Sequence, residues 1–339
     1  MAELSSGYAG LLRIELMARN RLWARGRPHV ESYGSAPVIV YAPECGRHGN
    51  FFDPAYAAIL ARPQWLRRFD KVHTQAARAL PKAERRWREL DSSMSSDALL
   101  MNVFCTPGVA DSAIVRRSLG IEDNAEPEFG WKARVPLRNS RFDRTEVDMR
   151  LGSLLVEAKL TESDFQSRAA RIVETYRDFD QVFDRERLPR MAIATARVRR
   201  ASEDPENVSQ EFESMLGDPE ARVTIDPAFP PPGEPGYASY QLIRNVLAAH
   251  AGGCSFCVLH DERRPDLREQ WFQVIAAVRN AELRTRLKVL TWQELAALLP
   301  GALQQFLDLK YGIAAPGKSA TAAEPLQAGS IRQTLRRGL

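Results

Sequence analysis

The sequence predicts an α/β protein with a central mixed β-sheet flanked by helices and an N-terminal, mainly helical region. Short apolar runs typical of strands alternate with helical patterns through much of the chain after residue 92. Near the middle of the chain, two short strand patterns separated by a glycine turn predict a hairpin. With 339 residues and 44% hydrophobic content, the chain is long enough for one large domain or for a domain with an added subdomain.

Composition predicts a soluble globular protein. The start of the chain, residues 1–7, lacks the basic end and apolar run of a signal peptide, and no stretch is long enough to cross a bilayer. We therefore expect a cytoplasmic protein with no membrane partner. The formal net charge is +4, and arginine dominates the basic residues. Guanidinium groups match phosphate oxygens bidentately, which permits nucleic acid as a partner, although a GC-rich genome produces the same arginine bias.

The region 1–91 carries helical patterns without a chemical signature. Apolar residues recur at helical spacing over residues 8–17 and 56–66, and residues 38–41 form a strand-like run between them. The stretch 75–90 predicts a helix rich in arginine around Trp87. That helix either follows a phosphate backbone or presents an ordinary solvated face.

A helix is predicted directly after Ser92. Ser95 or Ser96 can cap its N-terminus, and Pro107-Gly108 ends it. The positions expected in the core are Leu99, Leu100, Val103 and Phe104. Asp97 lies in the first turn, where the helix dipole favours an acid.

The predicted hairpin joins residues 145–149 to residues 154–160 through the turn 151–153. Side chains alternate faces along a strand, so Val156, Ala158 and Leu160 are expected to face the core. Glu157 and Lys159 then share the other face, on the side of the strand end that carries Asp148.

Asp148, Glu157 and Lys159 have the chemistry of a metal-dependent phosphodiesterase centre. Carboxylate oxygens suit Mg²⁺ or Mn²⁺ rather than zinc. A glutamate and a lysine on a half-buried strand are costly to desolvate unless both are paired, as they are next to a divalent cation and a phosphate. The alternative interpretation is an ordinary solvated strand face with a surface ion pair.

The rest of the chain predicts alternating helices and strands. A capping signal at residues 161–164 precedes apolar residues at helical spacing, and Pro-rich residues 226–236 exclude a helix or a central strand. Further helices are expected over 240–250 and 267–283, and strands over 191–195, 256–259 and 287–290. Thr291 and Glu294 form a capping box that begins a last helix. Residues 314–339 are expected to be a disordered basic tail. The apolar positions of the helix after residue 164 are Phe165, Ala169, Ile172, Tyr176, Phe179 and Phe183.

Four cysteines are too few for a disulfide framework in a chain of this size. Cys254 and Cys257 have the spacing of half a zinc site, but in a buried strand their sulfurs would face opposite sides. Cys45 with His48 is another candidate pair, in a glycine-rich polar stretch more typical of a surface loop.

Asp148 followed by Glu157-Ala158-Lys159 resembles the signature of the PD-(D/E)XK nuclease superfamily. The segments 92–104 and 240–245 are similar to those of a bacterial group of restriction endonucleases in that superfamily, and the resemblance covers Ser92 to Leu299. One departure is Val147, where the superfamily often has proline. The resemblance implies a restriction-endonuclease-like core at 92–313, preceded by the region 1–91 and followed by the tail 314–339.

The resemblance also implies a function: Mg²⁺-dependent DNA endonuclease activity, with Mn²⁺ able to substitute. Asp148, Glu157 and the Ala158 carbonyl would bind one or two Mg²⁺, and Lys159 would orient or deprotonate the attacking water. Asp97 would be a further metal ligand, unless it is only a helix-dipole acid. In related nucleases, a glutamine or tyrosine from a later helix lies beside the metal or the scissile phosphate.

By that resemblance, Gln241 is a candidate catalytic residue, with Tyr240 beside it and Arg244 as a phosphate contact. The alternative is that these side chains form hydrogen bonds between helices.

Two other classes of function remain open from the sequence. The chain could be a catalytically inactive nuclease fold that binds DNA or acts as a scaffold, or an interaction protein independent of nucleic acid. Cutting a duplex generally needs two centres, so we expect a homodimer. The sequence has no methyltransferase motif, phosphate loop or helicase element, so a methyltransferase or other defence partner would be a separate chain.

Overall fold

A five-stranded mixed sheet forms the centre of the protein, with strand order β14-β13-β9-β8-β5. The computed structural model describes residues 2–32, 37–71, 88–122, 125–144, 146–193 and 233–317. Strands β9, β13 and β14 are parallel, while β8 is antiparallel to both β9 and β5. The α/β class and the mixed sheet are therefore confirmed. The strands are β5 (Pro127–Lys132), β8 (Glu146–Leu151), β9 (Leu154–Ala158), β13 (Ser255–His260) and β14 (Leu287–Thr291).

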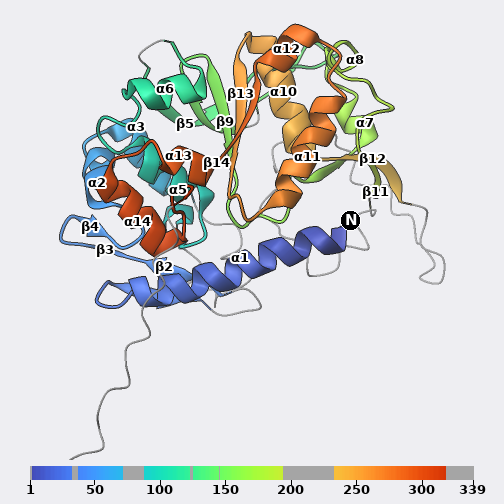
Figure 1. Ribbon diagram of the computed structural model, residues 1–339. Coiled ribbons are helices and arrows are strands. Elements are labelled where there is room, and N and C mark those ends of the chain that lie inside the picture. The colour runs from blue at the N-terminus through green and yellow to red at the C-terminus, as the bar shows by residue number, and fades with distance from the viewer. Residues whose placement is uncertain are drawn as a thin grey trace, which may run out of the picture.

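Helices cover both faces of this sheet, as Figure 1 shows. One apolar core forms under α10 (Tyr240–Gly252), α11 (Pro265–Ala276) and α12 (Ala281–Thr285). The core on the opposite face contains residues of α1 (Ala2–Trp23), α5 (Ser96–Phe104), α6 (Ala113–Leu119), α13 (Trp292–Ala296) and α14 (Gly301–Tyr311). Strand β9 alternates between them, because Leu155 belongs to the first core while Val156 and Ala158 belong to the second. Strand β9 is therefore buried on both faces.

The predicted hairpin is confirmed. Strands β8 and β9 pair with Met149 opposite Val156 and Leu151 opposite Leu154. Gly152 has φ of 59°, in the left-handed region that glycine enters without a Cβ penalty, so it allows the tight reversal.

The N-terminal region combines helices with short strands. Residues 72–87 are outside the described part of the chain, so most of the arginine-rich stretch 75–90 is not covered. Phe51, Ile59 and Trp65 share a small apolar cluster with Ala98 and Met101 of α5, which joins this region to the core. The elements are β1 (His29–Glu31), β2 (Ile39–Tyr41), β3 (Pro43–Glu44), β4 (Arg47–His48), α2 (Asp53–Leu60), α3 (Pro63–Leu66), η1 (Arg67–Asp70) and η2 (Glu89–Asp91).

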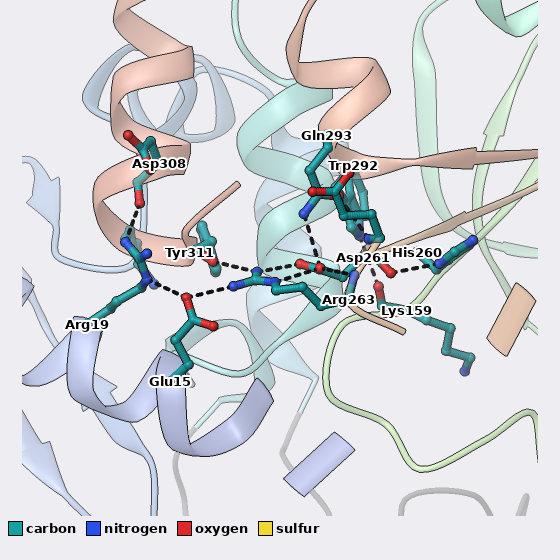
Figure 2. A network of polar contacts seen from close by, with 12 residues as sticks. Glu15, Arg19, Lys159, His260, Asp261, Arg263, Trp292, Gln293, Asp308 and Tyr311 are labelled. Carbon is teal, nitrogen blue, oxygen red and sulfur yellow. Dashed lines mark hydrogen bonds and ion pairs between the residues drawn. The ribbon is translucent and has the colours of Figure 1, made fainter. Parts of the chain in front are cut away.

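A polar network connects helix α1 to the end of β13 and to α14 (Figure 2). Glu15 lies 2.8 Å from the Arg263 guanidinium, which in turn lies 2.6 Å from the Asp261 carboxylate just beyond β13. Arg19 Nη1 donates to the carbonyl oxygen of Asp308 in α14 at 3.0 Å. These contacts bind the first helix to the C-terminal half of the fold.

A buried lysine links α14 to the N-terminal region. Lys310 is fully buried, and its Nζ donates to Asn20 Oδ1 at 3.0 Å and lies 5.3 Å from the Tyr41 ring and 4.1 Å from the Tyr311 ring. Burial, with a smaller contribution from Arg27, lowers the pKa of Lys310 well below that of a free lysine. Protonation therefore favours the unfolded chain, so stability decreases as the pH falls from the unfolded pKa, about 10.4, toward the folded one.

We expect Lys310→Met to be more stable than the parent at pH 7, because methionine fills the site without a charge to bury. The gain should shrink as the pH rises toward the unfolded pKa, about 10.4, and vanish above it, where the lysine is neutral in both states. Urea unfolding at pH 7 and pH 10 measures both differences. A variant that is less stable than the parent at both pH values would show that the ammonium is stabilised by its π contacts instead.

The helix predicted after residue 164 is wrong. Residues 167–169 form strand β10 (Ser167–Ala169), followed by the single turns α7 (Ala170–Val173) and α8 (Phe179–Val182). Phe165, Tyr176 and Phe183 are buried as expected, but hydrogen bonds to a distant strand replace those of a helix. Tertiary pairing has overridden the local helical pattern.

The distant strand is β12 (Glu234–Ala238), the middle strand of a second sheet with order β10-β12-β11, where β11 is Arg190–Ile193. The prediction that the proline-rich stretch excludes a central strand is therefore wrong for residues 234–236. Strand β10 pairs only with residues 236–238, so Pro235 has a neighbouring strand on one side, β11, where it faces Ala192. A missing N–H is tolerated where no strand needs it. Residues 194–232 lie outside the described residues.

The other helix boundaries are partly as predicted. Ser95 caps α5 by accepting from the Ala98 N–H, and Thr291 with Glu294 forms the capping box of α13. The helix expected over 267–283 ends at Ala276, and Asn280 caps the separate helix α12. Strand β5 and helices α6 and α14 were not predicted from the sequence. Within the described part of the chain, no helix is both long and apolar enough to span a membrane.

Candidate active site

Asp148 and Glu157 lie beside each other on the hairpin. The pairing of Met149 with Val156 makes Asp148 and Glu157 the next opposed positions, and Asp148 Oδ2 accepts the Ala158 N–H at 2.7 Å. Burial raises the pKa of Asp148 well above its usual value, and the negative charges of Glu157 and Asp97 raise it further. The hairpin thus concentrates negative charge at one point, where a cation would relieve the repulsion.

Lys159 follows directly after β9 and is buried beside Glu157. Its Nζ lies 3.1 Å from Glu157 Oε1 and donates to Gln241 Oε1 at 2.8 Å. Burial opposes the charged form, but Glu157, Glu162 and Asp148 outweigh that effect and raise the pKa of Lys159. Glu157 and Lys159 are only 2% and 4% exposed, so the alternative of a solvated strand face is wrong.

Helix α10 covers this ion pair with two amides. Gln241 and Asn245 are four residues apart and so share one face of the helix. Gln241 binds Lys159, and Asn245 Nδ2 donates to Glu157 Oε2 at 2.7 Å. Glu157 and Lys159 are two residues apart on the strand, and the two amides that bind them are four residues apart on the helix, so each pair lies on one face of its element. Sequence reasoning selected Gln241 but missed Asn245, although the spacing of four was visible.

Arg244 and Tyr240 are engaged within the protein. Arg244 is buried, donates to Asn245 Oδ1 through Nε at 3.1 Å and Nη2 at 3.0 Å, and donates to the Glu146 carbonyl at 2.9 Å. The Tyr240 hydroxyl lies 2.8 Å from that of Tyr176. These contacts fit the expected alternative of internal hydrogen bonds, and Arg244 fixes Asn245, which holds Glu157.

The backbone at Lys159 is fixed from the opposite core. Trp292 Nε1 donates to the Lys159 carbonyl at 2.9 Å, while the Lys159 side chain points away from the network drawn in Figure 2. The Lys159 N–H donates to the Leu259 carbonyl at 2.8 Å, which continues the pairing of β9 with β13. The position of the ammonium is therefore set by anchors on both sides of the residue.

Asp97 acts on the site through its charge, and its carboxylate is itself paired with two cations. Its Oδ2 lies 2.6 Å from Arg68 Nη2 and 3.3 Å from Lys71 Nζ, and it is 4% exposed. Burial raises the pKa of Asp97, but Arg68 and Lys71 outweigh it and the net effect lowers that pKa. Its charge still acts on Asp148. The role of Asp97 as a metal ligand remains a prediction.

Asp148, Glu157 and the Ala158 carbonyl have the donor chemistry for Mg²⁺, which in proteins is commonly held by one or two carboxylates together with water and substrate phosphate. Among the described residues, no group of three or more histidine, cysteine or acidic side chains is placed to hold a metal ion. The two adjacent carboxylates fit a metal that keeps part of its water shell.

The cysteines do not form the zinc site considered above. Cys254 belongs to the core on one face of the sheet and Cys257 to the core on the other. His48 is buried and its Nε2 lies 3.1 Å from Asp91, whereas Cys45 is exposed. The zinc site is therefore wrong for Cys254 and Cys257, and no group of three or more ligands that includes Cys45 or His48 is found among the described residues.

We expect Asn245→Ala to destabilise the fold by about 1–3 kcal/mol, because Glu157 Oε2 and the Arg244 guanidinium each lose a buried partner. Urea unfolding measures the change. Asn280→Ala is a matched control, since Asn280 is a helix cap outside the site. It should cost about 1 kcal/mol. A loss at Asn245 no larger than that of the control would mean that other groups satisfy Glu157.

The mixed sheet, its two helical layers and the acidic hairpin define a restriction-endonuclease-like α/β protein. A comparison with protein families supports this class independently. Residues 23–312 match the family described as restriction endonuclease associating with ARP, and the chain belongs to that family. The match includes most of the N-terminal region as well as the sheet. Searches of curated proteins and of solved structures found no match.

Proposed function

We propose that the protein is a Mg²⁺-dependent DNA endonuclease of the PD-(D/E)XK type. The observation that carries this proposal is the arrangement of half-buried Asp148 beside buried Glu157, with the Lys159 ammonium 3.1 Å from Glu157. Family membership supports a nuclease-type function. Two carboxylates and one ammonium at a strand end suit a metal ion and a phosphodiester together.

The side chains of the site have separate roles in this proposal. Asp148, Glu157 and the Ala158 carbonyl hold the metal, which when bound would lower the pKa of an attacking water and neutralise phosphate charge. Lys159, oriented by Gln241, places its ammonium where it can hold that water or a phosphate oxygen. The oxygen of the attacking water would bond to phosphorus as the bond to the 3′ oxygen breaks, without a covalent enzyme intermediate. The water would lose a proton to solvent, and the leaving 3′ oxygen would take a proton from solvent.

Asn245 positions the carboxylate of Glu157 in the same way that Gln241 positions Lys159. Both amides come from one helix, so they fix the two groups relative to each other. Such supporting hydrogen bonds restrict the orientation of metal ligands and raise their effectiveness.

Cleavage assays on supercoiled plasmid and on single-stranded DNA test the proposal. We expect cutting with Mg²⁺ or Mn²⁺ and none with EDTA. Salt-sensitive DNA binding without metal-dependent cutting would instead identify an inactive nuclease fold that acts as a DNA-binding or scaffold protein. Neither binding nor cutting would point to an interaction protein.

The partners follow from the same proposal. DNA is the substrate, and the cytoplasm is the expected place of action. Cutting both strands of a duplex favours a homodimer, and a methyltransferase or another defence protein would be a separate chain. The description of the family names ARP as an associated component, so we include it among the candidate partners.

A further inference from the structure

We propose that Arg68, held against Gly130 opposite Asp148, provides a fixed cation in place of a second metal ion, so that each chain binds one divalent cation. This inference rests on the proposed function and specifies its metal stoichiometry. Arg68 lies in η1, in the N-terminal region, and its side chain is 8% exposed. The region 1–91 would thus complete the site rather than only flank it.

Gly130 shows how Arg68 reaches the strand that pairs with the one carrying Asp148. Strands β5 and β8 pair Phe129 with Met149 and Trp131 with Val147, so Gly130 stands opposite Asp148. A Cβ at Gly130 would lie 2.4 Å from Arg68 Nη1, and the residue has φ of 65°. The positive φ favours glycine there, and a Cβ would push the Arg68 guanidinium from its place. The absent side chain leaves the space that the guanidinium occupies.

Arg68 and Lys71 neutralise the acid expected to bind a further metal. Arg68 pairs with Asp97 through Nη2 and with Glu146 through Nη1. Lys71 Nζ lies 2.8 Å from Glu89 and 3.3 Å from Asp97. A divalent ion bound to Asp97 would need to displace or approach two positive groups, and like charges at such distances repel strongly in a buried site. The pair Asp148 and Glu157 carries no such guanidinium contact in the described structure.

Arg68 also has an unused donor. Its Nε is buried and has no hydrogen-bond partner among the described residues. A buried N–H without an acceptor is costly. The guanidinium therefore keeps its place between Asp97 and Glu146 with one donor unsatisfied.

Calorimetric titration of the DNA-free protein with Mn²⁺ tests the stoichiometry without relying on activity. We expect one ion per chain in the parent. Asp97→Asn should keep that ion with less than about threefold change in Kd, whereas Asp148→Asn should weaken it at least about tenfold. Two ions in the parent, or equal losses in both variants, would overturn the inference.

Arg68→Gln removes the guanidinium and leaves Lys71 as the remaining cation beside Asp97 and Glu146, so a second, weaker Mn²⁺ site should appear. Arg117→Gln, on the exposed surface of α6, is the matched control and should bind one ion. A folded Arg68→Gln variant that still binds a single ion would contradict the proposal that Arg68 excludes a second metal ion. If that variant does not fold, the Mn²⁺ stoichiometry of the parent and the Mn²⁺ affinity of Asp97→Asn still test the proposal. Unchanged binding by Asp148→Asn would instead refute the proposed metal centre itself.

Discussion

Replacing Lys159 with alanine should lower the rate of Mg²⁺-dependent DNA cleavage by about 10³-fold, while DNA binding persists. Removal of one preorganised electrostatic group from an active site typically costs about 10²–10³-fold in rate. Lys159 is buried, lies 3.1 Å from Glu157 and is held by Gln241, so no exposed lysine can replace it in position. Single-turnover cleavage of a plasmid, together with DNA binding measured in Ca²⁺, separates the two effects.

Lys132→Ala is the matched control, because Lys132 is an exposed lysine on β5 of the same sheet. It should cut as fast as the parent. Lys159→Met, which retains most of the apolar stem, guards against a folding defect, and circular dichroism reports the fold of all three variants. Cleavage by Lys159→Ala at the parental rate would refute the proposed mechanism.

The hairpin was predictable because its signals are local. Alternation along residues 154–160, the turn at Gly152 and the spacing from Asp148 to Lys159 all lie within a few residues of one another. The pairing of β8 with β9 joins residues 149–151 to residues 154–156, which are close in the sequence. The same holds for the caps at Ser95 and Thr291, where each donor and acceptor are three residues apart.

The environment of the hairpin was not predictable in the same way. A strand whose polar face is solvated and a strand whose polar face is covered by a helix have the same alternation of polar and apolar residues in the sequence. Only α10, more than eighty residues further on, decides between them by placing Gln241 and Asn245 over Lys159 and Glu157. The spacing of the two amides was a signal, but nothing local connects them to β9.

Arg68 illustrates the limit most clearly. It pairs with Asp97 and Glu146 and lies against Gly130, and these three positions belong to three different elements later in the chain. No motif links an arginine in a short 3₁₀ helix to a glycine in a strand. The failed helix over residues 165–183 has the same origin, because β10 pairs with a strand that begins at Glu234.

Asp148→Asn should abolish detectable cleavage and, in EDTA at neutral pH, stabilise the protein, because burial and the neighbouring carboxylates disfavour the charged form of Asp148. The amide oxygen can still accept the Ala158 N–H, while the negative charge beside Glu157 and Asp97 is lost. Mg²⁺ should reverse the order of stability, since an ion that binds only the folded parent stabilises it by RT ln(1 + [Mg²⁺]/Kd).

Thermal unfolding of parent and Asp148→Asn with EDTA and with Mg²⁺ measures both parts of this prediction. Asp111→Asn, at an exposed position far from the hairpin in sequence, should respond to Mg²⁺ as the parent does. If Asp148→Asn is less stable than the parent in EDTA, the carboxylates are not in electrostatic conflict. The arrangement would then be a structural network, because a metal site must hold like charges together before the metal arrives.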